Sequence, residues 1–269
     1  MSIAGRSFTF NGKNSETDFA SLLCQFNGLE QTMQTALTYT LNRGELQPAR
    51  AVPNYYSSQY SDTLQFSATI AKSDHTPYSQ AEERRILSWL TSPAGYAPFS
   101  VADPPGEDYH SGIIYYVRCT GVTEERPMGG SSVLGLTLSF ACSAPYGFSE
   151  ERRYPFACSS AASITVENDS DDLGTDLWPV IELKALQTGT ITLCSSACPE
   201  DVMSLSLRTN QEVVIDCAAM DITDNLGLFD YSRDTNLAWI RLSPGVNTLS
   251  VTGACEGAVR FRAVRMVAI

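Results

Sequence analysis

Short runs in which apolar and polar residues alternate are the feature that most restricts the possible folds of this chain. In one such run, Met203, Leu205 and Leu207 alternate with two serines and Arg208. Successive side chains of a β-strand point to opposite faces, so this pattern indicates a strand with one buried face. Turns rich in proline and glycine separate it from similar runs at 64–70, 113–119, 134–142, 213–217 and 259–263. The chain is therefore predicted to be mainly β, with antiparallel strands in sandwiches or barrels.

One segment carries the signals of a helix instead. Ser79 and Glu82 have the spacing of a capping box, in which the serine serves the amides of the first turn and the glutamate reaches back. An apolar face follows at 86–90, and proline and glycine at 93–95 end the segment. We expect this helix to cover a sheet or its open edge. A second, weaker helical stretch is predicted at 18–24.

The length of 269 residues suits one large domain or two of ordinary size. The composition changes between 146 and 163, where a charged run at 150–153 precedes a stretch of small residues at 157–163. Such a segment is typical of a linker or of an exposed crossing between domains. We therefore expect a first domain at 1–157, a β-sandwich or barrel with one capped helix, and a second domain, a β-sandwich, at 158–269.

Charge and hydropathy exclude several classes of function. The net charge is −12, whereas proteins that bind nucleic acid grooves concentrate Lys and Arg on one surface. No apolar run approaches the roughly 20 residues that cross a bilayer, and the first residues lack the pattern of a secretory signal. We expect a soluble product made in the cytoplasm, where thiols stay reduced. Cys119, Cys142 and Cys217 continue the apolar faces of predicted strands, which indicates core positions.

The residues that could carry catalysis do not form a recognisable set. The two histidines, His75 and His110, lie in polar, turn-rich segments, and Asp74 and Ser111 merely neighbour them in the sequence. A catalytic triad requires an arrangement in space that such adjacency does not supply. The sequence also lacks a nucleophile elbow, a phosphate-binding loop and a zinc-protease helix motif. We therefore predict no catalytic residues and no cofactor.

Two segments have some features of metal sites. Cys194 and Cys198 lie four apart, but structural zinc takes four ligands, commonly as two close pairs, and no second pair is present. The alternatives are two free thiols in a turn or a local disulfide. The acidic run 169–176 begins like a calcium loop, but Val180 stands where the bidentate glutamate belongs. An irregular calcium loop and a solvated acidic turn remain open, and we predict no metal.

Several segments together suggest a family. The segment 8–15 reads Phe-Thr-Phe-Asn-Gly-Lys-Asn-Ser and is followed by Asp18 and Phe19. The capped helix ends at 85–90, and the strand at 138–142 leads into Ala-Pro-Tyr-Gly. The second half contributes further segments at 164–169, 179–183 and 242–249. In this order the features resemble distal tail proteins of phages with long non-contractile tails, across nearly the whole chain. The cysteine content and the insert at 194–198 depart from that pattern.

The resemblance implies a structural function at the phage tail tip. It implies a ring, expected to be hexameric, that links the tail tube above to tail-tip or fibre proteins below. The first domain would form the ring, the second would be a galectin-like sandwich, and DNA would pass the lumen without specific binding. Because exposed edges must be paired or guarded, the candidate interface residues are those of one predicted hairpin: Phe10, Asn11, Gly12, Lys13, Asn14 and Ser15.

Two other functions are alternatives to this one. The second domain could be a carbohydrate- or receptor-binding module. However, lectin sites of the galectin fold use a His, Asn and Arg set with a stacking Trp, and this half has no histidine. Of its tryptophans, Trp239 alternates with Leu237 and Arg241 and is predicted to be core, while Trp178 precedes a proline at a strand start. A hydrolase that acts on cell wall would need a paired carboxylate site, and no pair stands out.

Overall fold

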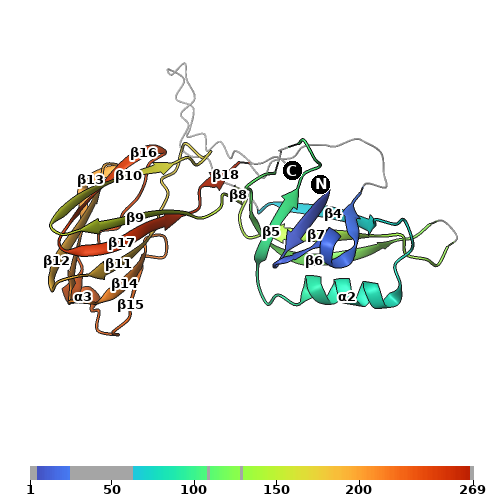
Figure 1. The fold of residues 1–269 in the computed structure, drawn as a ribbon, viewed down its shortest axis with the longest axis horizontal. Coiled ribbons are helices and arrows are strands. Elements are labelled where there is room, and N and C mark those ends of the chain that lie inside the picture. The colour runs from blue at the N-terminus through green and yellow to red at the C-terminus, as the bar shows by residue number, and fades with distance from the viewer. Residues whose placement is uncertain (1–4, 25–62, 108–109, 128–129, 267–269) are drawn as a thin grey trace, which may run out of the picture. The chain divides into compact units, whose positions relative to one another are not determined.

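The computed structural model describes residues 5–24, 63–107, 110–127 and 130–266 (Figure 1). The chain forms two compact units, Met1–Phe148 with Met266–Ile269, and Ser149–Arg265. The division falls before the predicted boundary between 157 and 158. That boundary lies within strand β9 (Arg152–Cys158), which pairs with β17 (Cys255–Phe261) of the second unit. The small residues after β9 form a tight turn between two strands rather than a linker.

The first unit is built on a seven-stranded antiparallel sheet in the order β2-β1-β5-β6-β7-β4-β3. Leu23 N donates to Arg6 O at 2.9 Å, which brings the last strand of this order back to the start of β1. The sheet therefore curls towards closure, as predicted for a barrel-like domain. Its strands are β1 (Ser7–Phe10), β2 (Lys13–Asn14), β3 (Ser21–Leu23), β4 (Gln65–Lys72), β5 (Ala97–Ala102), β6 (Tyr115–Glu125) and β7 (Gly135–Cys142).

Helix α2 (Gln80–Thr91) runs along one face of this sheet (Figure 1). The predicted capping box is present: Ser79 N donates to the Glu82 carboxylate at 2.7 Å, and the Ser79 side chain accepts from Glu82 N. The predicted apolar face is buried at Ile86, Trp89 and Leu90. These side chains join the aromatic residues of the sheet in one core.

The second predicted helix, at 18–24, is wrong. The helix there is α1 (Ser15–Phe19), a single capped turn. Ala20 adopts a left-handed conformation with φ 50°, which ends the helix. The chain then continues as β3, so the apolar residues that suggested a helical face belong to a strand.

The second unit is a sandwich of two antiparallel sheets, with orders β10-β16-β12-β13 and β15-β14-β11-β17-β9. Apolar side chains from both sheets form a single core. The mainly β prediction is confirmed for both units. The elements not yet given are β8 (Gly147–Phe148), β10 (Ala161–Asn168), β11 (Val180–Ala185), β12 (Gly189–Ser195), β13 (Cys198–Leu207), β14 (Glu212–Asp216), β15 (Asp221–Asp224), α3 (Tyr231–Asp234), β16 (Gly245–Thr252) and β18 (Val264–Arg265).

The cysteines occupy the positions that the strand patterns predict. Cys142 and Cys217 are buried in the first and second core, and Cys119 is partly buried against the first core. All eight cysteines are free thiols. Among the helices of the described residues, none combines the length and hydropathy needed to cross a bilayer.

Candidate assembly surface of the first domain

The six predicted interface residues form one hairpin and the first residue of the helix that follows. Asn11 and Gly12 have φ values of 49° and 76°. Two successive left-handed residues define the tight turn whose twist matches the flanking strands, and an Asn-Gly pair suits it best. The turn sets the register in which Phe10 faces Lys13 and Thr9 faces Asn14. Strand β2 is the terminal strand in the order of the sheet.

Asn14 caps the short helix that follows the hairpin. Its side-chain oxygen accepts from Glu16 N at 2.8 Å and from Thr17 N at 3.2 Å. In return, Asn14 N donates to the Asp18 carboxylate at 2.8 Å. These bonds satisfy amides that a helix of this length leaves unpaired at its start. They also fix the orientation of Ser15, the first residue of the helix.

Ser15 completes the hydrogen bonding of β1. Its hydroxyl oxygen accepts from Phe8 N at 3.1 Å in a buried contact. On this edge of β1, the pairs with β2 begin at Thr9 and the bond from Leu23 reaches only Arg6. Phe8 therefore lies in a gap between two strands, and the serine replaces the missing ladder partner. The function of Ser15 is structural.

Phe10 is also structural, and it ties the hairpin to α2. Its ring packs against Trp89 and Phe140, with centroid distances of 6.0 and 5.8 Å. Its carbonyl accepts from Trp89 Nε1 at 2.9 Å in a buried contact. Because the side chain is 1% exposed, Phe10 cannot contact another protein directly. Its contacts with Trp89 and Phe140 hold the hairpin against the core.

The exposed part of the hairpin is its tip, residues 11–14. Asn11, Gly12 and Lys13 are exposed and Asn14 is half-buried. Within the described residues, Lys13 forms no ion pair, so the hairpin tip presents a positive charge. Nearby, Arg6 Nε donates to Glu16 Oε2 at 3.0 Å, and this hydrogen bond lowers the pKa of Glu16. The sequence pattern located the hairpin but did not separate its buried residues from its exposed ones.

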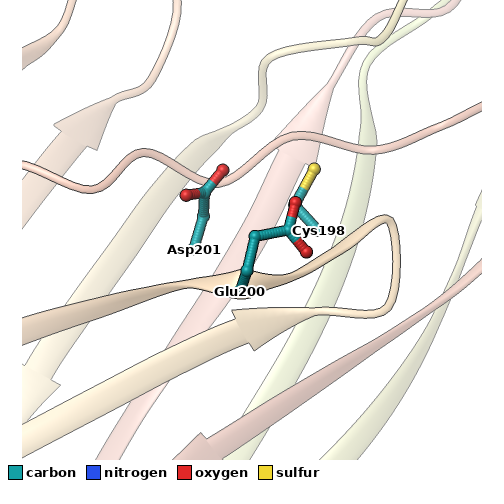
Figure 2. Close-up of side chains that lie close together, drawn as sticks. All are labelled: Cys198, Glu200 and Asp201. Atoms are coloured by element: carbon teal, nitrogen blue, oxygen red, sulfur yellow. The ribbon is translucent and has the colours of Figure 1, made fainter.

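A cluster in the second unit brings together groups that could bind a metal. The side chains of Cys198, Glu200 and Asp201 lie close together at the start of β13 (Figure 2), with one ligand atom from each within 4.8 Å of the others. However, Arg241 Nε contacts the Cys198 sulfur, and Arg241 Nη2 lies 3.7 Å from Asp201. A guanidinium already supplies the positive charge, and zinc would lack a fourth ligand. The cluster is an ion-pair arrangement.

The acidic residues at 169–176 form hydrogen bonds and ion pairs with different partners. Asp172 accepts from Gly174 N at 2.9 Å. Asp176 accepts from Ser243 Oγ at 2.9 Å and lies 3.6 Å from Arg241. Asp169 pairs with Arg152 and with Arg265, the latter at 2.6 Å. These contacts favour the acidic turn over a calcium loop.

The two histidines lie in loops, as predicted, but one has a partner that the sequence did not reveal. His110 Nδ1 lies 2.6 Å from Asp103 Oδ1, and His110 N donates to Asp103 Oδ2 at 2.7 Å. The pair therefore fastens the loop after β5. His75 is exposed, with φ 59°. Neither histidine is placed beside a nucleophile by the interactions within the described residues.

The tryptophans of the second unit differ in environment. Trp239 is partly buried and packs against the second core. The alternation that suggested a core position is nevertheless wrong, because Leu237 is exposed whereas Ile240 and Leu242 are buried. Trp178 is 38% exposed. Exposure alone does not make a stacking platform for a sugar, which also needs converging polar groups.

The fold and the matched family models together define a phage tail protein. A model described as a phage tail protein N-terminal domain matches residues 3–144, and one described as a phage tail C-terminal domain matches residues 146–261. The chain belongs to this family of phage tail proteins. No curated protein matches the chain.

Solved structures with the same fold come from phage tails. The Dit protein of phage SPP1, described as a paradigm of the hub adsorption apparatus in phages that infect Gram-positive bacteria, shares 16% identity with a TM-score of 0.61. The match covers 96% of this chain and 99% of that protein. A chain of the phage P2 baseplate, in its activated conformation with Ca, shares 8% identity, with a TM-score of 0.51 and coverage of 97% and 99%. The resemblance to distal tail proteins is confirmed at the level of the fold.

Proposed function

We propose that this protein is a ring-forming hub at the distal end of a phage tail, where it joins the tail tube to the tail-tip or receptor-binding proteins. The observation that carries the proposal is that the similarity to the SPP1 Dit protein covers both domains and nearly the full length of both chains. A shared domain alone would support a shared fold, whereas the same two domains in the same order support a shared architecture. The function is mechanical, and no catalytic step is assigned.

The first domain is proposed to form the ring, with six subunits as the expected number. A ring interface joins two different surfaces of each subunit and closes by rotation. The hairpin tip, with its terminal strand β2 and the exposed Lys13, is the proposed contact on one of these surfaces. Residues Phe10 and Ser15 support it from the core. The net charge of −12 suits a lumen through which DNA passes without binding.

The mass of the purified protein in solution tests the proposal. Light scattering across a range of concentrations, combined with negative-stain images, should show a closed ring of about six subunits, or a discrete half or double of it. Some rings close only on their neighbours, so the measurement is repeated with the tail tube protein. A strict monomer both alone and with the tube protein would overturn the proposal.

A pair of charge-reversal variants tests the hairpin tip. Lys13→Glu should weaken the ring, because it reverses an exposed charge on the proposed contact. Arg84→Glu is the matched control, since Arg84 is exposed on α2 and the variant changes net charge equally. If both variants assemble like the unmodified protein, the ring must use another surface.

A further inference from the structure

Two of the eight cysteines face each other across adjacent strands of the second unit. Strands β9 and β17 pair in an antiparallel register that places Cys158 opposite Cys255. Side chains of directly opposite residues point to the same face of a sheet. Both residues are buried, and burial together with the neighbouring Cys158 thiol raises the pKa of Cys255. Residues that lie far apart in the sequence therefore place two sulfur atoms together.

The backbone spacing at this pair suits a covalent link. Just beyond the paired ends of these two strands, Gly253 N donates to Ser160 O at 2.8 Å. Hydrogen-bonded pairs recur at every second residue of an antiparallel ladder, so Cys158 and Cys255 form such a pair, with a Cα separation of about 5.5 Å. Disulfides join Cα atoms that are roughly 4.4–6.8 Å apart. The Cα separation therefore permits a disulfide, but its Cβ atoms must come within about 3.5–4.5 Å, closer than the roughly 5.5 Å usual for a hydrogen-bonded pair. The two strand ends therefore move together when the link forms.

The cysteines that lie close together in the sequence are less suitable. Ser195 is the residue opposite Cys198 in the register of β12 and β13. Cys194 adjoins Ser195, so its side chain points to the other face of the sheet. The Cys194 sulfur donates to Pro199 O at 3.7 Å, whereas Cys198 contacts Arg241. The local disulfide that the sequence left open is therefore disfavoured.

We propose that Cys158 and Cys255 form a cross-strand disulfide when the protein meets a low-molecular-weight disulfide such as oxidised glutathione. One thiolate attacks the glutathione disulfide and releases one glutathione thiol. The second thiolate then attacks the mixed disulfide and releases the other. The two protein thiols lose two protons and two electrons, and the oxidant gains them. The resulting bond fastens β9 to β17.

The position of the pair suits a link that forms after synthesis. Disulfides are rare in the reducing cytosol and persist on virion surfaces, and a phage tail protein passes from the first environment to the second. β9 is the last strand in its sheet order, so no strand of the described residues pairs with its other side, and the cysteine pair lies at the end of this strand. Local opening of strand ends and edges gives the oxidant access.

Burial makes the reaction slow at neutral pH. It raises the pKa of Cys255 to about 11, and only the thiolate is the nucleophile. The rate of cross-linking should therefore increase as the pH rises towards that value. A slow reaction also keeps the thiols free while the chain folds in the cytoplasm.

The test uses the full chain, reduced, freed of reductant and then incubated with oxidised glutathione at mildly alkaline pH. Free thiols are counted by maleimide mass tagging after denaturation, and the link is located by non-reducing peptide mapping. We expect the loss of two of the eight thiols and a linked peptide that contains Cys158 and Cys255. A reductant should restore both thiols.

Single variants provide the controls. Cys158→Ala and Cys255→Ala should each abolish the link, and either one that keeps the circular dichroism spectrum of the unmodified protein suffices. Cys217→Ala removes a buried cysteine elsewhere in the same core and should leave the link intact. Retention of all eight thiols after prolonged incubation, or a link between other cysteines, would overturn the proposal.

The effect on stability is measured separately. The oxidised protein should unfold in its second unit at a higher temperature than the reduced protein, because the link restricts the unfolded chain. A link that leaves this temperature unchanged would show that it does not fasten β9. The result does not depend on ring formation, since both cysteines lie in the second unit.

Discussion

The hydroxyl of Ser15 accepts a hydrogen bond from Phe8 N at 3.1 Å, in the gap that β2 and β3 leave along the edge of β1. The first residue of α1 thus supplies the hydrogen-bond acceptor for a backbone amide of β1, seven positions earlier in the chain. The bond links the Asn-Gly hairpin, the capped turn of α1 and the curled sheet. It explains why a serine follows this hairpin at that spacing.

Replacement of Ser15 by alanine should destabilise the first unit. The variant leaves Phe8 N buried without a partner, and an unsatisfied buried amide costs about 1–3 kcal/mol. Calorimetry would show a lower unfolding temperature for the first unit, with the second unit as an internal reference. Thr17→Ala, an exposed change in the same helix, should alter the free energy of unfolding by less than about 0.5 kcal/mol. Equal effects of the two variants would contradict the structural function of Ser15.

Tyr115→Phe should leave stability unchanged or increase it by about 1 kcal/mol. The Tyr115 hydroxyl is buried and has no hydrogen-bond partner among the described residues, so its removal relieves a desolvation cost. The ring keeps its contacts with Phe66 and Phe99. The measurement is the midpoint of denaturant unfolding.

Tyr78→Phe is the matched control for this change. Tyr78 is also buried, but its hydroxyl lies 2.8 Å from Ser21 Oγ. Loss of that hydrogen bond should destabilise the first unit by about 1 kcal/mol. If Tyr115→Phe destabilised the protein as much as Tyr78→Phe does, the Tyr115 hydroxyl would have a partner after all.

These contacts show where sequence reasoning succeeds. Alternation predicts the strands because one face of each strand meets a core, and it places Cys142 and Cys217 correctly. The capping box at Ser79 was readable because both partners lie within one helical turn. The Asn-Gly turn was readable because few residue pairs tolerate two successive left-handed conformations.

The features that the sequence does not predict depend on which residues of distant segments lie opposite each other. The contact between Tyr78 and Ser21 and the pairing of Cys158 with Cys255 exist only after the strands are aligned. The boundary predicted between 157 and 158 falls within β9, because small residues suit the end of a strand and a tight turn as well as a linker. In the candidate site, the burial of Phe10 and Ser15 arises from contacts with Trp89 and Phe8 that the sequence pattern does not predict.

The capping box of α2 should make the first unit sensitive to acid. Hydrogen bonds from Ser79 N and Oγ, with Lys72 beside them, lower the pKa of Glu82 from 4.5 to about 2. A lowered carboxylate pKa adds stability above the value in the unfolded chain, and this stability is lost as the pH falls from about 4.5 to about 2. Because 43% of the Glu82 side chain is exposed, solvent screening limits the effect to about 1 kcal/mol or less.

Glu82→Gln tests this assignment. Unfolding midpoints measured across that pH range should depend less on pH in the variant than in the unmodified protein. Glu83→Gln removes the neighbouring acidic group of the same helical turn, outside the capping box, and should keep the dependence. If the unfolding midpoint of Glu82→Gln depended on pH as strongly as that of the unmodified protein, another group would cause the acid sensitivity.

Zinc should leave the unfolding temperature of the unmodified protein unchanged, because Arg241 occupies the charge centre of the cluster formed by Cys198, Glu200 and Asp201. Arg241→Ala removes that cation and leaves three protein ligands, so that a water molecule would have to take the fourth position of a bound zinc. In this variant, zinc should raise the unfolding temperature of the second unit. Arg233→Ala, which removes an arginine paired with Asp234, should show no such gain. A zinc-dependent rise in the unmodified protein would mean that the guanidinium gives way to the metal, and the cluster would then be a metal site.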